Sequence, residues 1–250
     1  MKKLTLLALC TFLLVPFSAG RALALTPSER LVYDVSWTGV KAATAVQEVT
    51  TKGNDVHIVS TTRSASWLNA FFKVNDRVES VLAKNEGAEL MVPKYYREQI
   101  NEGGFHTHKE VHFDSRNSKV ELKDHLKKTE RVDMVSQRTF DSLSSVYMVR
   151  NMELVVGKSI FIDIYDCKRL WNTEVQVVGR EEVKTPLGRF KTIVVKPLLK
   201  CDGFFARTGD VTVWLTDDDK RIPVKMTTKV KIGKITATLV GGSYWPNVEE

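Results

Sequence analysis

The chain has 250 residues, of which 43% are hydrophobic and 27% charged, and a formal net charge of +7 at neutral pH. This length and apolar content are enough to bury a large core, as one domain or two small ones. After the N-terminal segment no apolar run approaches the length that a membrane-spanning helix needs, so a helical integral membrane protein is excluded.

The first predicted element is a secretory signal peptide over residues 1–24. Two lysines precede an apolar run over residues 4–17, and Ala22 and Ala24 form the small-x-small pattern that signal peptidase accepts. The run is too short to span a hydrocarbon core of about 30 Å. We therefore expect cleavage before Leu25, a periplasmic location, and membrane contact that is at most peripheral.

Removal of the signal peptide takes away three basic residues and no acid, so the formal charge falls to +4. A mildly basic chain attracts partners that carry phosphates or carboxylates, such as lipid headgroups, lipopolysaccharide or peptidoglycan. An ordinary solvated surface explains the same charge. The periplasmic location excludes nucleic acid as a partner.

Strands with period-two alternation then follow from Leu31 to Val240. The pattern is clear at Ile160, Ile162 and Ile164, and also over residues 223–232, where Val224, Met226 and Thr228 are expected on one face. Turn signals rich in Gly, Asn and Asp separate the strands by short connections, which favours sequential antiparallel neighbours. We predict an all-β domain over residues 25–250, with about 12–14 strands in a large curved sheet or open barrel.

Two stretches depart from the alternation. Residues 66–72 contain Trp67, Phe71 and Phe72 and are predicted to form a helical turn or a loop. Residues 141–150 have apolar side chains at helical spacing after Asp141, a candidate N-cap, and are predicted to form one short amphipathic helix.

Two cysteines remain in the mature chain, Cys167 and Cys201. Each follows or precedes a predicted strand, and an oxidising compartment favours one disulfide between them. Two separate thiols are the alternative. A catalytic thiol is disfavoured because no histidine and no Cys-x-x-Cys motif accompanies either residue.

A histidine-rich strand covers residues 105–112. Alternation places four candidate ligands on one face, and neutral imidazoles at this spacing can share zinc or copper. A solvated polar face explains the pattern more simply, so no metal site and no cofactor is predicted. The four residues are His106, His108, Glu110 and His112.

The acidic run Asp217-Asp218-Asp219 could bind calcium, but a hairpin tip also favours Asp, because its side chain accepts hydrogen bonds from turn amides. We predict a turn. Serine nucleophile elbows and glycine-rich phosphate loops are absent from the sequence, which lowers the case for an enzyme.

Several phrases resemble the bacterial family known as domain of unknown function 3108, and together they span nearly the whole mature chain. They are residues 33–42, 72–80, 141–147, 179–181 with 185–188, and 213–218 with 221–224. The resemblance implies an exported β-rich domain and no particular activity. The final hairpins are also similar to periplasmic lipoprotein carriers of the Lol type, in which a bent antiparallel sheet wraps an apolar cavity.

The leading hypothesis is a non-enzymatic periplasmic protein that binds a lipid, an acyl chain or another amphipathic envelope component. We expect the sheet to enclose an elongated apolar pocket, partly covered by the helix at 141–150. The candidate ligand-binding residues are Trp67, Phe71, Phe72, Arg77, Tyr147 and Trp214.

Two alternatives stay open. One is an envelope glycan or peptidoglycan hydrolase that uses two of four carboxylates. The other is an assembly factor that binds a protein through exposed sheet edges. The sequence leaves the oligomeric state undecided. The four carboxylates are those of Asp34, Asp76, Glu79 and Glu181.

Overall fold

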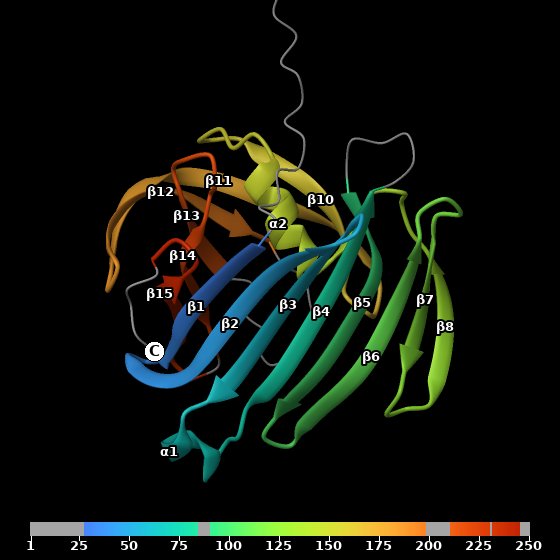
Figure 1. Ribbon diagram of the computed structural model, residues 1–250, viewed down its shortest axis with the longest axis horizontal. Coiled ribbons are helices and arrows are strands. Elements are labelled where there is room, and N and C mark those ends of the chain that lie inside the picture. The colour runs from blue at the N-terminus through green and yellow to red at the C-terminus, as the bar shows by residue number, and fades with distance from the viewer. Residues whose placement is uncertain (1–27, 85–90, 199–210, 231, 246–250) are drawn as a thin grey trace, which may run out of the picture.

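The computed structural model shows one large sheet that curls into an open barrel around a short helix (Figure 1). The structure describes residues 28–84, 91–198, 211–230 and 232–245. This confirms the predicted all-β, mainly antiparallel class. The described residues form 15 strands, slightly more than expected, and two helices.

The first half of the chain is a meander of eight strands interrupted by one helical turn. Its elements are β1 (Ser28–Trp37), β2 (Val40–Lys52), β3 (Asp55–Ser64), α1 (Ser66–Asn69), β4 (Asn75–Lys84), β5 (Met91–Glu102), β6 (Phe105–Asp114), β7 (Lys119–Asp124) and β8 (Thr129–Met134).

The second half begins with a short strand and the barrel helix and then forms a second meander. Its elements are β9 (Thr139–Asp141), α2 (Ser144–Asn151), β10 (Ser159–Tyr165), β11 (Leu170–Thr185), β12 (Gly188–Pro197), β13 (Val211–Thr216), β14 (Pro223–Lys229) and β15 (Lys234–Gly242).

The two meanders become one sheet because the first and last strands pair with each other. The strand order is β8-β7-β6-β5-β4-β3-β2-β1-β15-β14-β13-β12-β11-β10-β9, and only the β9–β10 pair is parallel. Strands β8 and β9 are therefore the two edges, and the sheet does not close through backbone pairing. Side chains bridge the seam instead: Arg131 on β8 donates to the carbonyl of Lys168 at 2.6 Å.

Helix α2 lies inside the curl, between the two halves of the sheet (Figure 1). It begins three residues later than predicted, at Ser144, because Asp141 still belongs to β9. The N-cap position is Leu143, which makes no side-chain capping hydrogen bond, so the prediction of Asp141 as the N-cap was wrong. The Oδ1 of Asp141 instead accepts hydrogen bonds from the amides of Leu143 and Ser144 at 2.9 and 2.8 Å, in the turn that leads into the helix. Its other oxygen accepts the hydroxyl of Ser80 on β4 at 2.6 Å, which ties the helix start to the first meander.

Apolar side chains fill the concave side of the sheet on both faces of α2. One cluster joins strands β2–β7 to Tyr147, and another packs β10–β13 against the side of the helix that bears Met148 and Val149. A third cluster lies where β1 and β15 meet β14. Two of the three clusters thus pack against the helix, as expected for a curved sheet with one apolar face.

A buried ion pair fastens the end of α2 to the beginning of β1. Nη1 and Nη2 of Arg150 donate to the carboxylate of Glu29, at 2.7 and 2.8 Å. The side chain of Arg150 is only 9% exposed and that of Glu29 only 2%. Tyr244 adds a hydrogen bond to the same carboxylate at 3.1 Å. This bidentate geometry compensates much of the desolvation of the two charges.

Two details of the strands and turns bear on the predictions. Asp218 accepts hydrogen bonds from the amides of Lys220 and Arg221, both at 3.0 Å, so the acidic run forms the predicted turn. Strand β14, in contrast, does not keep the expected alternation: Val224 is buried but Met226 is 40% exposed. A bulge where β13 pairs with β14, between Trp214 and Leu215, shifts the register there.

Candidate functional site

One end of the curled sheet exposes a row of large apolar side chains, which we call the rim. It is the end that carries α1, the β1–β2 and β5–β6 turns, and the connection between β14 and β15 (Figure 1). Phe71 is 85% exposed, Ile232 75% and Val40 58%. The rim residues, taken across the sheet from β6 to β15, are Phe105, Phe71, Trp67, Val40, Trp37 and Ile232.

The two rim tryptophans are held in place through their indole N–H groups. Trp37 donates to the carbonyl of Ile232 at 2.8 Å, and Trp67 donates to the carbonyl of Lys41 at 2.9 Å. Each polar group is therefore satisfied by backbone while a large part of the ring stays in solvent. Phe72 packs against Gly103 in the β5–β6 turn, where φ is +56° and a Cβ would lie 2.7 Å from the ring. The loop after α1 thus rests on the neighbouring hairpin.

Exposed basic side chains surround the rim. The same turns and strand ends bear five described bases, and Lys41 among them pairs with Asp34 at 2.6 Å. Besides Asp34, the acidic residues nearby are Asp76 and Glu102; Asp76 shares a strand face with Ser80, which contacts Asp141 inside the curl, and Glu102 is buried. The solvent side of the rim is therefore positive. The five bases are Lys41, Arg63, Lys73, Lys229 and Lys234.

Asp76 and Glu102 form a carboxyl pair just behind the rim. The amide of Asn101 donates to Asp76 at 2.8 Å. Burial, and then the negative charge and hydrogen bond of Asp76, raise the pKa of Glu102 to about 7; burial also raises the pKa of Asp76. At neutral pH Glu102 is protonated for part of the time, so the pair carries less than its full negative charge behind the rim.

The structure does not bring the six predicted ligand-binding residues into one pocket. Trp67 and Phe71 are on the rim, and Phe72 lies beneath it. Arg77 is on the convex face, where it bonds to Glu79 at 2.6 Å. The remaining two predicted residues lie elsewhere.

Tyr147 and Trp214 have structural surroundings. Tyr147 is 2% exposed within the core of the first meander, and its hydroxyl has no hydrogen-bond partner among the described residues. Trp214 donates its indole N–H to Glu181 at 2.8 Å and lies beneath the ammonium of Lys225. Sequence spacing could not distinguish a core aromatic residue from one that lines a ligand site, because both kinds occupy the same positions of the strand and helix patterns.

The four carboxylates considered for hydrolysis are also dispersed. Asp34 pairs with Lys41, Glu79 with Arg77, and Glu181 with Trp214. Only Asp76 faces another carboxyl, that of Glu102, which the sequence reasoning did not single out. The antiparallel pairing of β4 with β5 brings these two together, because Asp76 lies at the start of β4 and Glu102 at the end of β5. Pairing the two predicted strands was the signal available in the sequence.

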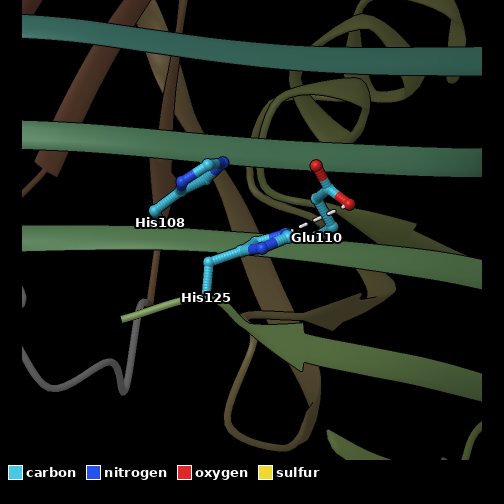
Figure 2. Close-up of side chains that lie close together, drawn as sticks. All are labelled: His108, Glu110 and His125. Carbon is cyan, nitrogen blue, oxygen red and sulfur yellow. Dashed lines mark ion pairs between the residues drawn. The ribbon is translucent and has the colours of Figure 1, made fainter. Parts of the chain in front are cut away.

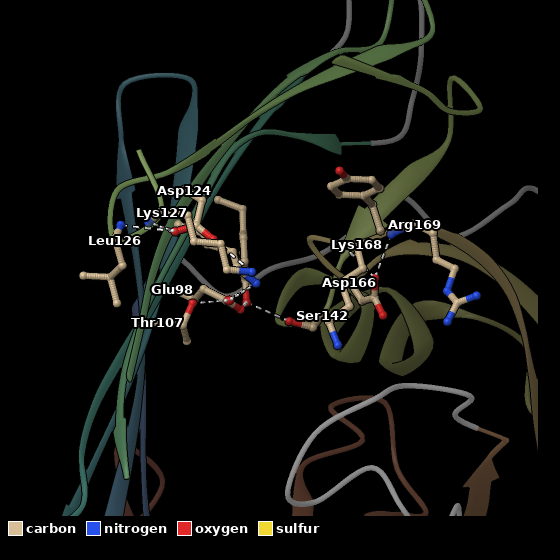
Figure 3. A network of polar contacts seen from close by, with 12 residues as sticks. Glu98, Thr107, Asp124, Leu126, Lys127, Ser142, Asp166, Lys168 and Arg169 are labelled. Atoms are coloured by element: carbon tan, nitrogen blue, oxygen red, sulfur yellow. Dashed lines mark hydrogen bonds and ion pairs between the residues drawn. The ribbon is translucent and has the colours of Figure 1, made fainter. Parts of the chain in front are cut away.

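A cavity of about 300 Å³ lies at the seam between the β7–β8 hairpin and the turn at residues 166–169. Figure 3 shows Glu98, Thr107 and Asp124 on the strands facing Ser142 and that turn. Oδ1 of Asp124 accepts hydrogen bonds from the amides of Leu126 and Lys127 in the following turn. Nζ of Lys109 lies 3.3 Å from Oε1 of Glu98. Most lining residues are charged, which differs from the elongated apolar pocket expected. They are Lys109, Leu122, Asp124, Lys127, Thr129, Glu130, Arg131, Cys167 and Lys168.

Cys167 lines this cavity; it is buried, has a φ of +63° and forms no disulfide with another described residue. Burial raises the pKa of its thiol well above the usual value, which disfavours a reactive thiolate. The predicted partner, Cys201, lies outside the described residues. The disulfide between them stays a prediction.

The histidine-rich strand is divided among three environments. His106 lies 3.1 Å from the side-chain oxygen of Asn101, and His112 packs against the ring of Tyr95. His108 and Glu110 instead meet His125, which follows β7 and was not considered from the sequence (Figure 2). These three are the residues of the described chain that could hold a metal ion.

The fold defines a class of protein: a curled antiparallel sheet, barrel-like but unclosed, with a helix inside. The described residues contain no helix long and apolar enough to span a membrane. The family described as "Protein of unknown function (DUF3108)" matches residues 32–240, and the chain belongs to this family.

Among solved structures, the fold is similar to a beta-barrel-like protein of domain of unknown function DUF1849 from Brucella abortus. The TM-score is 0.52 at 11% sequence identity, and the match covers 86% of this chain and 96% of the other. No match was found among curated proteins. At this identity the similarity shows the fold alone.

Proposed function

We propose that this protein binds an amphipathic component of the bacterial envelope, and that it does so by laying its rim on an anionic lipid surface. The observation that carries the proposal is the rim itself, where exposed aromatic and aliphatic side chains lie in one row among exposed lysines and an arginine.

The apolar half of the argument rests on how the rim is built. Trp37 and Trp67 have their indole N–H groups satisfied by backbone, so contact with lipid would leave no buried donor without a partner. Phe71 and Ile232 project furthest into solvent. Side chains of this kind, an aromatic body beside a hydrated polar group, favour the boundary between headgroups and acyl chains.

The charge of the rim supplies the second half. Lysines beside an apolar row attract anionic headgroups, each by about 1 kcal/mol close to the surface. Asp76 and Glu102 are set back behind the rim, and a pKa of about 7 leaves Glu102 protonated for part of the time at neutral pH, which reduces their opposition to this attraction. A purely protein-binding patch has no need of this excess of positive charge.

Binding to a lipid surface through the rim fits the structure better than enclosure of an acyl chain in the interior. Tyr147 and its neighbours fill the curl with packed side chains, and the cavity at the seam is lined mostly by charged residues. An enclosed lipid tail would require an apolar cavity. The lipid-binding hypothesis is therefore placed at the rim instead of the interior.

Vesicle co-sedimentation of the mature chain tests the proposal. We expect binding to vesicles of phosphatidylcholine with phosphatidylglycerol, weak binding to phosphatidylcholine alone, and weakening by salt. Phe71→Ser should reduce the affinity roughly tenfold, since partial burial of such a side chain contributes about 1.5 kcal/mol.

Phe161→Ser is the matched control. Phe161 is 58% exposed, but it lies on β10, away from the rim. Equal loss of binding in both variants, or no binding of the unmodified chain to anionic vesicles, would reject the rim as a lipid-binding surface. Circular dichroism of each variant confirms that the fold is kept.

The carboxyl pair favours a second candidate, hydrolysis of an envelope glycan. A carboxylic acid with a pKa near 7 beside a second carboxylate can donate a proton to a leaving group. Incubation with peptidoglycan fragments and mass spectrometry of the products tests this. Products released by the unmodified chain and absent with Glu102→Gln would favour the enzyme, and no release would remove it.

A further inference from the structure

The convex face of the sheet brings three metal-binding side chains together at the end of the β6–β7 hairpin. His108 and Glu110 are two residues apart on β6 and so share a face, opposite to the buried Val111. The hairpin register pairs Lys109 with Asp124, and the amide of His125 donates to the carbonyl of His108 at 2.9 Å. Backbone pairing therefore fixes the position of His125 beside His108.

The side chains are already close to a coordinating arrangement (Figure 2). The three candidate ligand atoms lie within 4.8 Å of one another, and the two imidazoles stack with centroids 4.3 Å apart. Nε2 of His125 is 3.2 Å from Oε2 of Glu110. Ligands of a tetrahedral zinc ion lie about 3.3 Å apart, given bonds near 2.0–2.1 Å, so small side-chain rotations suffice.

Two imidazole nitrogens at this place lack a hydrogen bond. Nε2 of His108 and Nε2 of His125 are inaccessible to solvent and make no hydrogen bond within the described part of the chain; the approach of His125 to Glu110 is an ion-pair distance without hydrogen-bond alignment. A buried polar atom without a partner is unfavourable, because it has lost its hydrogen bonds to water. A bound metal ion would satisfy both nitrogens at once.

The surrounding groups orient the carboxylate. Arg97 on β5 lies 3.7 Å from Oε1 of Glu110, which leaves Oε2 directed toward His125. Lys123, which pairs across the hairpin with Glu110, directs its ammonium to Glu130 at 3.1 Å instead. Partners that hold the second oxygen of a ligand carboxylate are a regular feature of metal sites.

We propose that His108, Glu110 and His125 bind a divalent transition-metal ion, with Zn²⁺ as the first candidate. Two imidazoles and one carboxylate suit zinc, nickel or copper, whereas calcium and magnesium prefer sites made of oxygen alone. Three protein ligands leave a fourth position for water or for an external donor. The site is separate from the rim, so this inference is independent of the proposed lipid binding.

Isothermal titration of the untagged mature chain with ZnCl₂ tests the site. We expect one equivalent to bind and the melting temperature to rise, because an ion that binds only the folded state at a concentration 100 times its Kd stabilises by about 2.7 kcal/mol. His125→Ala should lower the affinity at least tenfold. His112→Ala, a histidine on the same face of β6 that lies outside the cluster, should not change it.

A measurement without substitution covers the case in which His125→Ala alters the fold. Zinc should shift the ¹⁵N resonances of the His108 and His125 side chains and leave those of His106 and His112 in place. Equal zinc affinity in the two alanine variants, resonance shifts at other histidines, or no stoichiometric binding would each overturn the site. Vesicle binding should be unchanged by zinc, which separates this outcome from that of the rim.

Discussion

The two ends of the curled sheet use charged and aromatic side chains in opposite ways. At the end where β1 begins, Glu29 and Arg150 are buried against each other and join α2 to the sheet. At the rim, aromatic rings and lysines point into solvent and the carboxyl pair is set back. One end holds a buried ion pair that we expect to stabilise the fold, and the other is the end that we propose to contact a lipid surface. Substitutions at the two ends should therefore separate folding from binding.

The largest effect is expected from Arg150→Met. This change leaves the carboxylate of Glu29 buried without its partner, which should reduce the free energy of unfolding by about 3–5 kcal/mol. Urea unfolding followed by circular dichroism measures it. The double variant Glu29→Leu with Arg150→Met should recover most of the loss, because no unpaired charge remains. A loss below about 1 kcal/mol for Arg150→Met would contradict the structural role given to this pair.

Reversal of one rim charge should weaken binding while stability is kept. Lys73→Glu should weaken binding to anionic vesicles roughly tenfold, since loss and reversal of one charge near the surface amount to about 1–2 kcal/mol. The difference should shrink in high salt. Lys184→Glu is the control: it changes the net charge equally, but Lys184 lies at the C-terminal end of β11 and is not a rim residue. Equal effects of the two variants would mean that net charge, not the rim, governs binding.

The smallest effect concerns pH and the carboxyl pair. Glu102 has a pKa near 7 in the folded chain against a usual value of 4.5, so the native state binds more protons than the unfolded state between these values. Its contribution to stability is therefore favourable at low pH and is lost as the pH rises through about 7. Glu102→Gln should raise the melting temperature above about pH 7, by about 2–4 °C for each kcal/mol, and change it little near pH 4. Thermal melts at both pH values decide this, and equal shifts at the two would argue against a raised pKa.

Much of the fold follows from local sequence pattern. Alternation predicted the strands because most of them have one buried face, and the turn residues predicted the hairpins because Gly39, Gly103 and Gly233 adopt positive φ there. Asp141 marked the start of the helix region. The bulge at Val224 was not predictable, since it depends on how β13 and β14 pair.

The candidate sites were predicted less well, for a reason that the histidines illustrate. His106, His108 and His112 looked equivalent on one strand, and only the pairing of β6 with β7 selected His108 and added His125. The turn at residues 115–118 contained this information, because the hairpin centred on Arg116 and Asn117 brings residues 108 and 125 opposite each other. Pairing the predicted strands through their turns would have found the cluster.

The sequence by itself determined the strands, the turns, the helix region and the family, because these depend on residues near one another in the chain. The tertiary structure decided which aromatic side chains are core and which are exposed. Tyr147 is enclosed because α2 lies inside the curl, and Phe71 is exposed because the loop after α1 rests on a neighbouring hairpin. It also decided that Glu29 meets Arg150, 121 residues later. Contacts at such separations depend on how the whole sheet curves, and no local spacing encodes that curvature.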